Sequence, residues 1–274
     1  MMRLRNAMVL AVMLALVTAG CSRLTFIRPS SKSKSIPFPE AQVEHRVSDS
    51  AATKRRLATQ DRLRLATQRL GSGDLVSAER EARMLLKDDP GSADAYTVLA
   101  VIRSQQGNTA QAGDYYKRAA ELAPARGGAL NNYGAWLCAN GFPAEALVWF
   151  DRALAAPGYA TPAAALANAG GCALKTGQYE RAGRDLRQAL SLDPDNSYAL
   201  ASMADNEYRQ GRYFEARAFT ERRLAAAPAD PSVLQLAADI ETKLGDKAAA
   251  SRYVQRLRAE FPSVTANPGE TTRP

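Results

Sequence analysis

The sequence predicts an all-α fold, a right-handed superhelix of six helical hairpins, from a set of positions that recur along the chain. A glycine returns after 34 residues, or after 36 once, at Gly73, Gly107, Gly141, Gly177, Gly211 and Gly245. A small residue precedes each glycine by seven positions, and an alanine follows it by five. A proline follows by seventeen positions, or by sixteen in the third unit. We expect each unit to be one hairpin that is stable only when it stacks on its neighbours.

Each recurring residue has a place in the expected hairpin. The small residue lies in the first helix, helix A, and lets it approach the second, helix B. The glycine ends helix A, because it adopts the positive φ that other residues resist. The alanine lies in helix B, where a larger side chain would force the two helices apart, and the proline ends helix B. A unit of 34 residues with these features resembles the tetratricopeptide repeat.

The repeats fill an expected domain at residues 57–264. They divide as 59–92, 93–126, 127–162, 163–196, 197–230 and 231–264. The third unit has two extra residues in the segment Ala156–Pro162, which predicts a longer turn before the fourth. Arg62 and Arg69 stand at usually apolar positions of the first unit, as in an end cap. We expect residues 265–274 to be a disordered tail.

The N-terminus, residues 1–20, has the pattern of a secretory signal peptide. Arg3 and Arg5 form a basic start, and the apolar run Ala7–Val17 follows. That run is too short to span a bilayer, which needs about 20 apolar residues.

The segment Leu16–Cys21 resembles the lipidation box of bacterial lipoproteins, and Cys21 is then the acylated residue. The alternative is an ordinary signal peptide whose cleavage site happens to precede a cysteine. By resemblance to lipoprotein sorting rules, Ser22 in place of an aspartate favours the outer membrane. The acyl chains would then hold the protein at the inner leaflet, facing the periplasm.

Residues 21–56 are predicted to be a flexible, basic linker. The segment is rich in serine, contains three prolines and has no apolar period, so it cannot bury enough surface to fold alone. Its eight basic and three acidic side chains hold most of the net charge of +8. The linker is a spacer, or alternatively a segment that contacts anionic lipid. A nucleic-acid binder would instead carry its basic residues on a folded face, so we expect no nucleic-acid partner.

The residues of catalytic and metal sites are scarce. The one histidine, His45, lies in the expected linker. No cysteine or histidine pair has metal-site spacing, and no glycine-rich loop follows a strand. The carboxylates fall mostly on expected helix surfaces and caps, whereas acid–base catalysis needs positioned groups with tuned pKa values. We expect a protein-binding scaffold rather than an enzyme, with no cofactor, metal or small-molecule substrate.

Cys138 and Cys172 fall in the A helices of the third and fourth units. Adjacent A helices lie side by side, and the periplasm is oxidising, so these cysteines form either a disulfide or two buried thiols. A disulfide needs Cα atoms about 4.4–6.8 Å apart, less than the usual spacing of helix axes of about 8–10 Å. Gly134, Gly170 and Gly171 are expected to allow the closer approach.

Four segments resemble the type IV pilus biogenesis/stability lipoproteins, the pilotins of the pilus secretin. They are Asn131–Cys138 with the following Gly141, Pro157–Tyr159, Leu166–Leu174 and Ser202–Ala216. The resemblance implies an outer-membrane lipoprotein that binds the secretin subunit and promotes its targeting and multimerisation, and hence pilus biogenesis. The two central cysteines of that family match Cys138 and Cys172, which favours the disulfide.

A partner groove is expected along helix A of the early units. Its predicted residues are Leu63, Thr67, Leu70, Thr97, Val101, Ser104, Asn131 and Ala135. The alternative is that several of them only pack between helices. Other functions left open are a scaffold for tight-adherence pili or cell-wall hydrolases, and a glycan-binding protein. The last would need exposed aromatic side chains, for which Tyr208 and Trp136 are the candidates.

Overall fold

The computed structural model describes residues 50–263, which form twelve α-helices. They are α2 (Ala51–Gly71), α3 (Leu75–Asp88), α4 (Ala93–Gln105), α5 (Thr109–Leu122), α6 (Gly127–Ala139), α7 (Pro143–Leu154), α8 (Pro162–Lys175), α9 (Tyr179–Leu192), α10 (Ser197–Arg209), α11 (Tyr213–Ala226), α12 (Pro231–Leu244) and α13 (Lys247–Glu260). All of them lie in the second of two units, residues 1–48 and 49–274. The expected signal peptide, Cys21, most of the linker and the expected tail lie outside the described residues.

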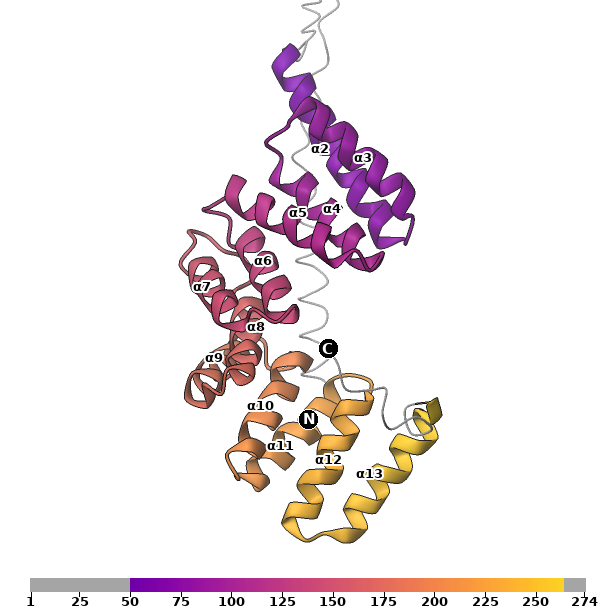
Figure 1. The fold of residues 1–274 in the computed structure, drawn as a ribbon, viewed down its shortest axis with the longest axis vertical. Coiled ribbons are helices and arrows are strands. Elements are labelled where there is room, and N and C mark those ends of the chain that lie inside the picture. The colour runs from indigo at the N-terminus through magenta and orange to yellow at the C-terminus, as the bar shows by residue number, and fades with distance from the viewer. Residues whose placement is uncertain (1–49, 264–274) are drawn as a thin grey trace, which may run out of the picture. The chain divides into compact units, whose positions relative to one another are not determined.

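The helices pair as six consecutive hairpins, from α2–α3 to α12–α13, and each hairpin packs on the next (Figure 1). This confirms the predicted all-α superhelix of six hairpins. Each even-numbered helix is a helix A and each odd-numbered one a helix B. The long turn predicted after the third unit joins α7 to α8.

The recurring residues occupy their expected places. The six glycines all have φ between +71° and +91° and follow the A helices. The small residues seven positions earlier and the alanines five positions later are all buried. The B helices end two residues before their proline, or three in the third unit. The period in the sequence therefore determines where each helix ends and how closely the two helices of a hairpin approach.

The start of the first helix differs from the expected domain boundary. Residues 51–56, which the sequence assigns to the linker, form the first turns of α2. The Ser50 hydroxyl accepts a hydrogen bond from the Thr53 amide and so caps the helix there. These turns expose nearly all their side chains, and an exposed segment leaves no apolar period to find.

Two groups of buried side chains form most of the core. The larger, the central core, lies between α5 and α10 and includes Leu130, Phe150, Leu186 and Met203. The smaller, the N-terminal core, consists of Ala66, Ala78, Ala82, Val98, Leu99 and Ile102. Among residues 50–263, no helix is both long and apolar enough to cross a membrane.

Candidate partner-binding surface

The A helices contact one another in order along the array, in addition to their own B helices. We call the surface that they form together the A-helix face. The eight residues of the predicted groove all lie on α2, α4 or α6, within this set of helices.

Packing within the array occupies several of these eight side chains. Leu63 and Leu70 pack against the N-terminal core. Asn131 is buried, and its side-chain carbonyl accepts a hydrogen bond of 3.0 Å from the Asn168 amide. Thr67 is exposed on α2, and Val101 is half-buried on α4. These five residues do not line any of the hollows described next.

The other three predicted residues, Thr97, Ser104 and Ala135, line two adjoining hollows that share Asn132. Ser104 and Ala135 border the hollow between α4 and α6, of about 310 Å³. Thr97 borders the second, of about 480 Å³, together with the turn Pro157–Thr161. The structure thus places the two-residue insertion of the third unit beside the predicted groove.

Polar and aromatic groups line the hollow between α4 and α6. The Trp136 indole donates a hydrogen bond of 3.2 Å to the Thr109 carbonyl. Burial raises the pKa of Tyr116, while the nearby Ser104 hydroxyl acts in the opposite direction. Trp136 and Tyr208, the candidates for sugar stacking, are both half-buried, and Tyr208 packs against Tyr213 with ring centroids 5.6 Å apart. The hollow between α4 and α6 therefore offers hydrogen-bonding groups beside the half-buried rings of Trp136 and Tyr116.

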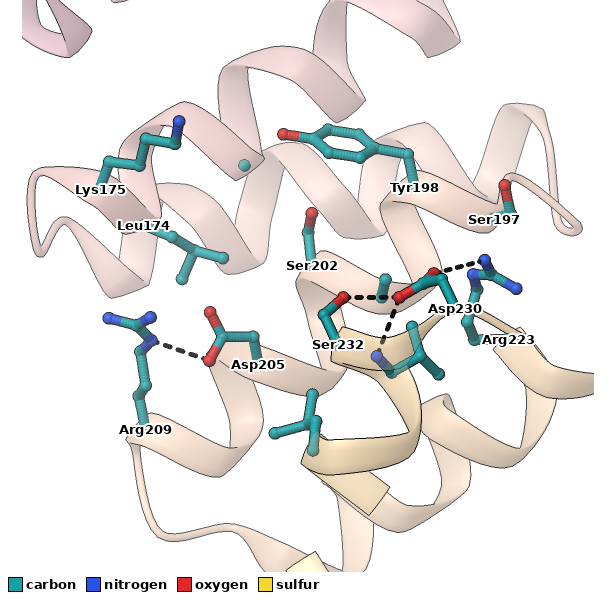
Figure 2. Close-up of a pocket in the computed structure, with 14 residues that line it drawn as sticks. Leu174, Lys175, Ser197, Tyr198, Ser202, Asp205, Arg209, Arg223, Asp230 and Ser232 are labelled. Atoms are coloured by element: carbon teal, nitrogen blue, oxygen red, sulfur yellow. Dashed lines mark hydrogen bonds and ion pairs between the residues drawn. The ribbon is translucent and has the colours of Figure 1, made fainter. Parts of the chain in front are cut away.

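A larger hollow, of about 570 Å³, lies on α8, α10 and α12 (Figure 2). We call it the C-terminal hollow. The predicted groove residues all lie in the first three units, so none of them is in this hollow. Carried forward by the repeat lengths, the positions of Thr97, Val101 and Ser104 lead to Gly171, Leu174, Ala201 and Asp205, which all line it. The periodic register was the signal that could have found it.

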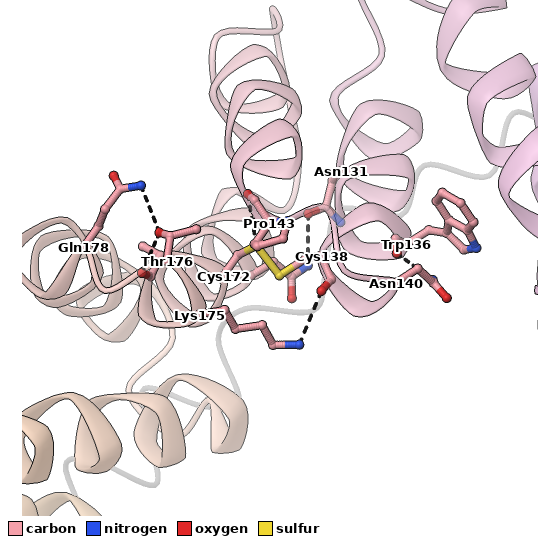
Figure 3. The surroundings of a disulfide bond; sticks show 11 residues. Asn131, Trp136, Cys138, Asn140, Pro143, Cys172, Lys175, Thr176 and Gln178 are labelled. Atoms are coloured by element: carbon pink, nitrogen blue, oxygen red, sulfur yellow. Dashed lines mark hydrogen bonds between the residues drawn. A yellow bond between two sulfur atoms is a disulfide. The ribbon is translucent and has the colours of Figure 1, made fainter. Parts of the chain in front are cut away.

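The structure contains the disulfide between Cys138 and Cys172, one of the two alternatives for these residues (Figure 3). Their Cα atoms are 5.9 Å apart. The bond joins the end of α6 to α8. The Lys175 ammonium donates a hydrogen bond of 3.3 Å to the Cys138 carbonyl. Together with the pair formed by Asn131 and Asn168, these contacts hold α6 against α8.

The three glycines expected to bring α6 and α8 together act elsewhere, and that expectation is wrong. A Cβ atom on Gly134 would lie 2.9 Å from the Phe150 ring of α7, and one on Gly170 would lie 2.5 Å from Leu186 of α9. Both glycines therefore bring helix A close to its own helix B. A Cβ atom on Gly171 would meet the Tyr198 hydroxyl of α10 at 2.2 Å. The disulfide and the polar contacts, not these three glycines, join α6 to α8.

Within the described part of the chain, no three histidine, cysteine, aspartate or glutamate side chains gather as a metal site would require. The carboxylates instead pair with arginines across helices. The hydrogen bond that Arg103 donates holds the pKa of Glu79 below its usual range, and this pair joins α4 to α3. These charges contribute to the packing of the array.

Comparison with known proteins gives the same repeat. Residues 93–126 and 173–240 match models described as tetratricopeptide repeat. The first match coincides with the second predicted unit. The fold and these matches define the chain as a tetratricopeptide-repeat protein, a fold that implies binding to other proteins.

Among tetratricopeptide-repeat proteins, the chain is similar to proteins of type IV pilus assembly. The chain is 24% identical to the type IV pilus assembly protein PilF of Pseudomonas aeruginosa over 193 residues. The aligned region covers 70% of this chain and 77% of PilF. The crystal structure of PilW, a widely conserved type IV pilus biogenesis factor, is 29% identical with a TM-score of 0.69, over 75% of this chain and 94% of PilW. The structure of PilF from Pseudomonas aeruginosa also has a TM-score of 0.69, at 24% identity over 76% of this chain and 94% of PilF. The chain is homologous to these type IV pilus assembly proteins.

Proposed function

We propose that this protein is an outer-membrane lipoprotein that binds the type IV pilus secretin subunit and promotes its targeting and multimerisation. The observation that carries the proposal is the 29% identity to PilW, a pilus biogenesis factor, over 94% of the length of that structure. The lipidation box at Cys21 supports the membrane location. The proposed role is that of a scaffold, without catalysis.

The arrangement of the chain suggests how such a scaffold would act. Acyl chains on Cys21 would hold the repeats at the inner leaflet of the outer membrane, and the linker would let them reach a partner. Anchoring raises the effective concentration of a captured subunit at the membrane where it must assemble. In the proposal, the hollows beside Thr97, Ser104 and Ala135 contact the secretin.

Deleting the gene tests the function. We expect the secretin multimer and surface pili to disappear, and the wild-type gene to restore both. Cys21→Ser should leave the protein unlipidated by mass spectrometry and the secretin poorly multimerised. Normal secretin multimers in the deletion strain would overturn the proposal and favour a scaffold for another envelope machine, such as a tight-adherence pilus or a cell-wall hydrolase.

A pair of matched double variants tests the surface. Thr97→Glu with Ser104→Glu places two negative charges at the hollows of α4 and α6. Ala110→Glu with Ala144→Glu makes the same charge change at exposed sites on two B helices, α5 and α7. We expect only the first pair to prevent co-purification of the secretin subunit, with equal helicity by circular dichroism. Equal capture by both pairs would exclude this surface.

A further inference from the structure

The first helix extends beyond the hairpin to which it belongs. α2 has 21 residues, whereas each of the other helices has between 12 and 14. The first side chain of α2 that bonds to α3 is that of Arg62. We call residues 51–61 the α2 extension. None of them is buried, and at 1.5 Å per residue they project about 16 Å past that contact (Figure 1).

Basic side chains gather on the α2 extension. Lys54, Arg55 and Arg56 are all exposed, and among the described residues none of them forms an ion pair. They belong to the segment 21–56, in which eight basic and three acidic side chains give a charge of +5. The structure therefore places +3 of this charge on a folded helix, although the sequence assigned all of it to a linker.

Nearby acidic side chains do not offset these charges. Asp61 pairs with Arg64 at 3.8 Å, and Asp88 of α3 lies 3.7 Å from Arg62. The first turn of α2 contains no acidic residue. The helix macrodipole gives this end a partial positive charge, which favours acidic rather than basic side chains. The cluster thus opposes the preference of the helix, so the stability of the fold does not explain it.

Two further features indicate a lipid surface as the partner. Leu57 follows Arg56 directly and is 44% exposed, and helices that lie on membranes combine basic side chains with apolar ones that enter the headgroup region. Lys54 is 33 residues from Cys21, the proposed site of acylation. Acyl chains would therefore raise the effective concentration of the cluster at the membrane surface.

We propose that the α2 extension binds the anionic phospholipid headgroups of the membrane that holds the protein, through Lys54, Arg55 and Arg56, with Leu57 at the level of the headgroups. This rests on the lipid anchor of the proposed function, but it does not involve the secretin. The contact would fix the N-terminal end of the array at the membrane surface, and the following hairpins would extend from that end.

Co-sedimentation with vesicles tests this on the unlipidated mature chain, residues 21–274 with Cys21→Ser. We expect binding to phosphatidylcholine vesicles that contain phosphatidylglycerol, no binding to pure phosphatidylcholine, and weaker binding as salt is added. A triple variant, Lys54→Gln with Arg55→Gln and Arg56→Gln, should bind about a hundredfold more weakly, since each basic residue near an anionic surface contributes a factor of about five. Glutamine is a good helix former, so helicity by circular dichroism should not change.

The matched control is a triple variant of the last helix, Lys247→Gln with Arg252→Gln and Arg258→Gln. These three residues of α13 are exposed and form no ion pair within residues 50–263. The control has the same net charge as the first variant, with one lysine and two arginines replaced in each. It should bind the vesicles as the parent chain does.

A fluorescent side chain tests the orientation. Leu57→Trp should shift its emission to shorter wavelength when vesicles with phosphatidylglycerol are added, because the indole enters the headgroup region. Val76→Trp is the matched control, at a 79% exposed apolar site at the start of α3, the opposite end of the first hairpin. Its emission should not change.

Equal weakening by the two triple variants, or equal emission shifts at the two tryptophan sites, would overturn the proposal. So would binding to polyglutamate without binding to vesicles, which would assign the cluster to an acidic protein. These measurements contain no secretin, so their failure leaves the proposed secretin role standing. Normal secretin multimers in the deletion strain would overturn that role without changing the binding to vesicles.

Discussion

The block of α2–α5 and the block of α6–α9 share one repeat but are stabilised differently. In α6–α9, most of the central core packs around Phe150 and Leu186, and none of the four helices has a side-chain N-cap. In α2–α5, all four helices have one, from Ser50, Asp74, Ser92 and Asn108. Of the 21 residues of α2, only Ala66 is buried.

Ion pairs add to a smaller apolar core in the first block. Arg62 pairs with Glu81 at 3.4 Å, and Arg103 donates to Glu79 at 3.0 Å. Partly exposed pairs and caps each contribute about 1 kcal/mol, whereas burying one leucine or phenylalanine side chain contributes about 1.5–3 kcal/mol. A repeat can therefore keep its backbone pattern while its side chains change from a large apolar core to a smaller core with more polar contacts. We expect the first block to open more easily and to be more sensitive to pH.

The largest expected effect is removal of the disulfide from the central block. Cys138→Ala with Cys172→Ala should lower the free energy of unfolding of this block by about 2–4 kcal/mol, because the unfolded chain loses a closed loop. Both tryptophans of the chain, Trp136 and Trp149, lie in α6 and α7, so their fluorescence in urea measures this block.

Hydrogen exchange of the α2–α3 amides in the same double variant tests whether the first block is affected. Their protection should change little, because each repeat couples mainly to its neighbours. An unchanged tryptophan transition, or an equal loss of protection in both blocks, would contradict the division into two blocks.

The second expected effect comes from close helix packing. Gly170→Ala places a Cβ atom 2.5 Å from the buried Leu186 and 3.2 Å from the Ala182 carbonyl. The overpacking should cost about 1–3 kcal/mol, more than the gain in helix propensity returns.

Gly128→Ala is the matched control, because a Cβ atom at that site of α6 meets nothing within 4 Å. It should be neutral or stabilise by up to about 1 kcal/mol. Urea midpoints by tryptophan fluorescence measure both variants. A neutral Gly170→Ala would show that α8 and α9 can move apart at no cost.

These sites show what the sequence could predict. The repeated glycines, alanines and prolines predicted the six hairpins, since each has a backbone or steric role that is the same in every unit. The start of α2 escaped, because Ser50 caps an exposed helix with no apolar face. The spacing of the sequence indicated that Gly134 and Gly170 allow two helices to approach closely. It did not indicate which helix each glycine faces.

The residues of the predicted groove differ in their surroundings. Thr97, Ser104 and Ala135 line hollows, whereas Asn131 bonds to Asn168. A repeat position gives the face of a helix on which a residue lies. It does not say whether that residue already contacts a neighbouring side chain within the array. Such contacts depend on the side chains that differ from one unit to the next.

The third expected effect is on acid stability in the first block. The hydrogen bond from Arg103 lowers the pKa of Glu79 in the folded protein. Because the pKa is lower in the folded protein than in the unfolded chain, ionised Glu79 stabilises the fold at pH values above the ordinary glutamate pKa of about 4.3. This stabilisation is lost as the pH falls through the pKa of the folded state.

Glu79→Gln should therefore destabilise α3–α4 by about 1 kcal/mol at pH 6 and by progressively less toward pH 3. The difference between the urea midpoints of wild type and variant, followed by circular dichroism across this range, measures it. Glu121→Gln, at an exposed site on α5, should leave the midpoint unchanged. A difference for Glu79→Gln that does not vary with pH would mean that shape rather than charge joins α3 to α4.

The smallest expected effect tests whether the polar contacts of the first block are needed for stability at all. Arg62 and Glu81 are largely buried between α2 and α3, with 26% and 12% of their side chains exposed. The Nε atom of Arg62 is buried and has no hydrogen-bond partner among the described residues. Replacing such a pair by apolar side chains is often neutral or stabilising.

Arg62→Leu with Glu81→Leu should therefore change stability by less than about 1 kcal/mol, and toward higher stability. Glu81→Ala alone should destabilise, because Asp88, at 3.7 Å, is then the only described carboxylate that pairs with Arg62. Hydrogen exchange of α2–α3 distinguishes the two variants. If the double variant opened as readily as the single one, the ion pair itself would stabilise the first hairpin, and the first block could not be converted to the packing of the second by apolar substitution.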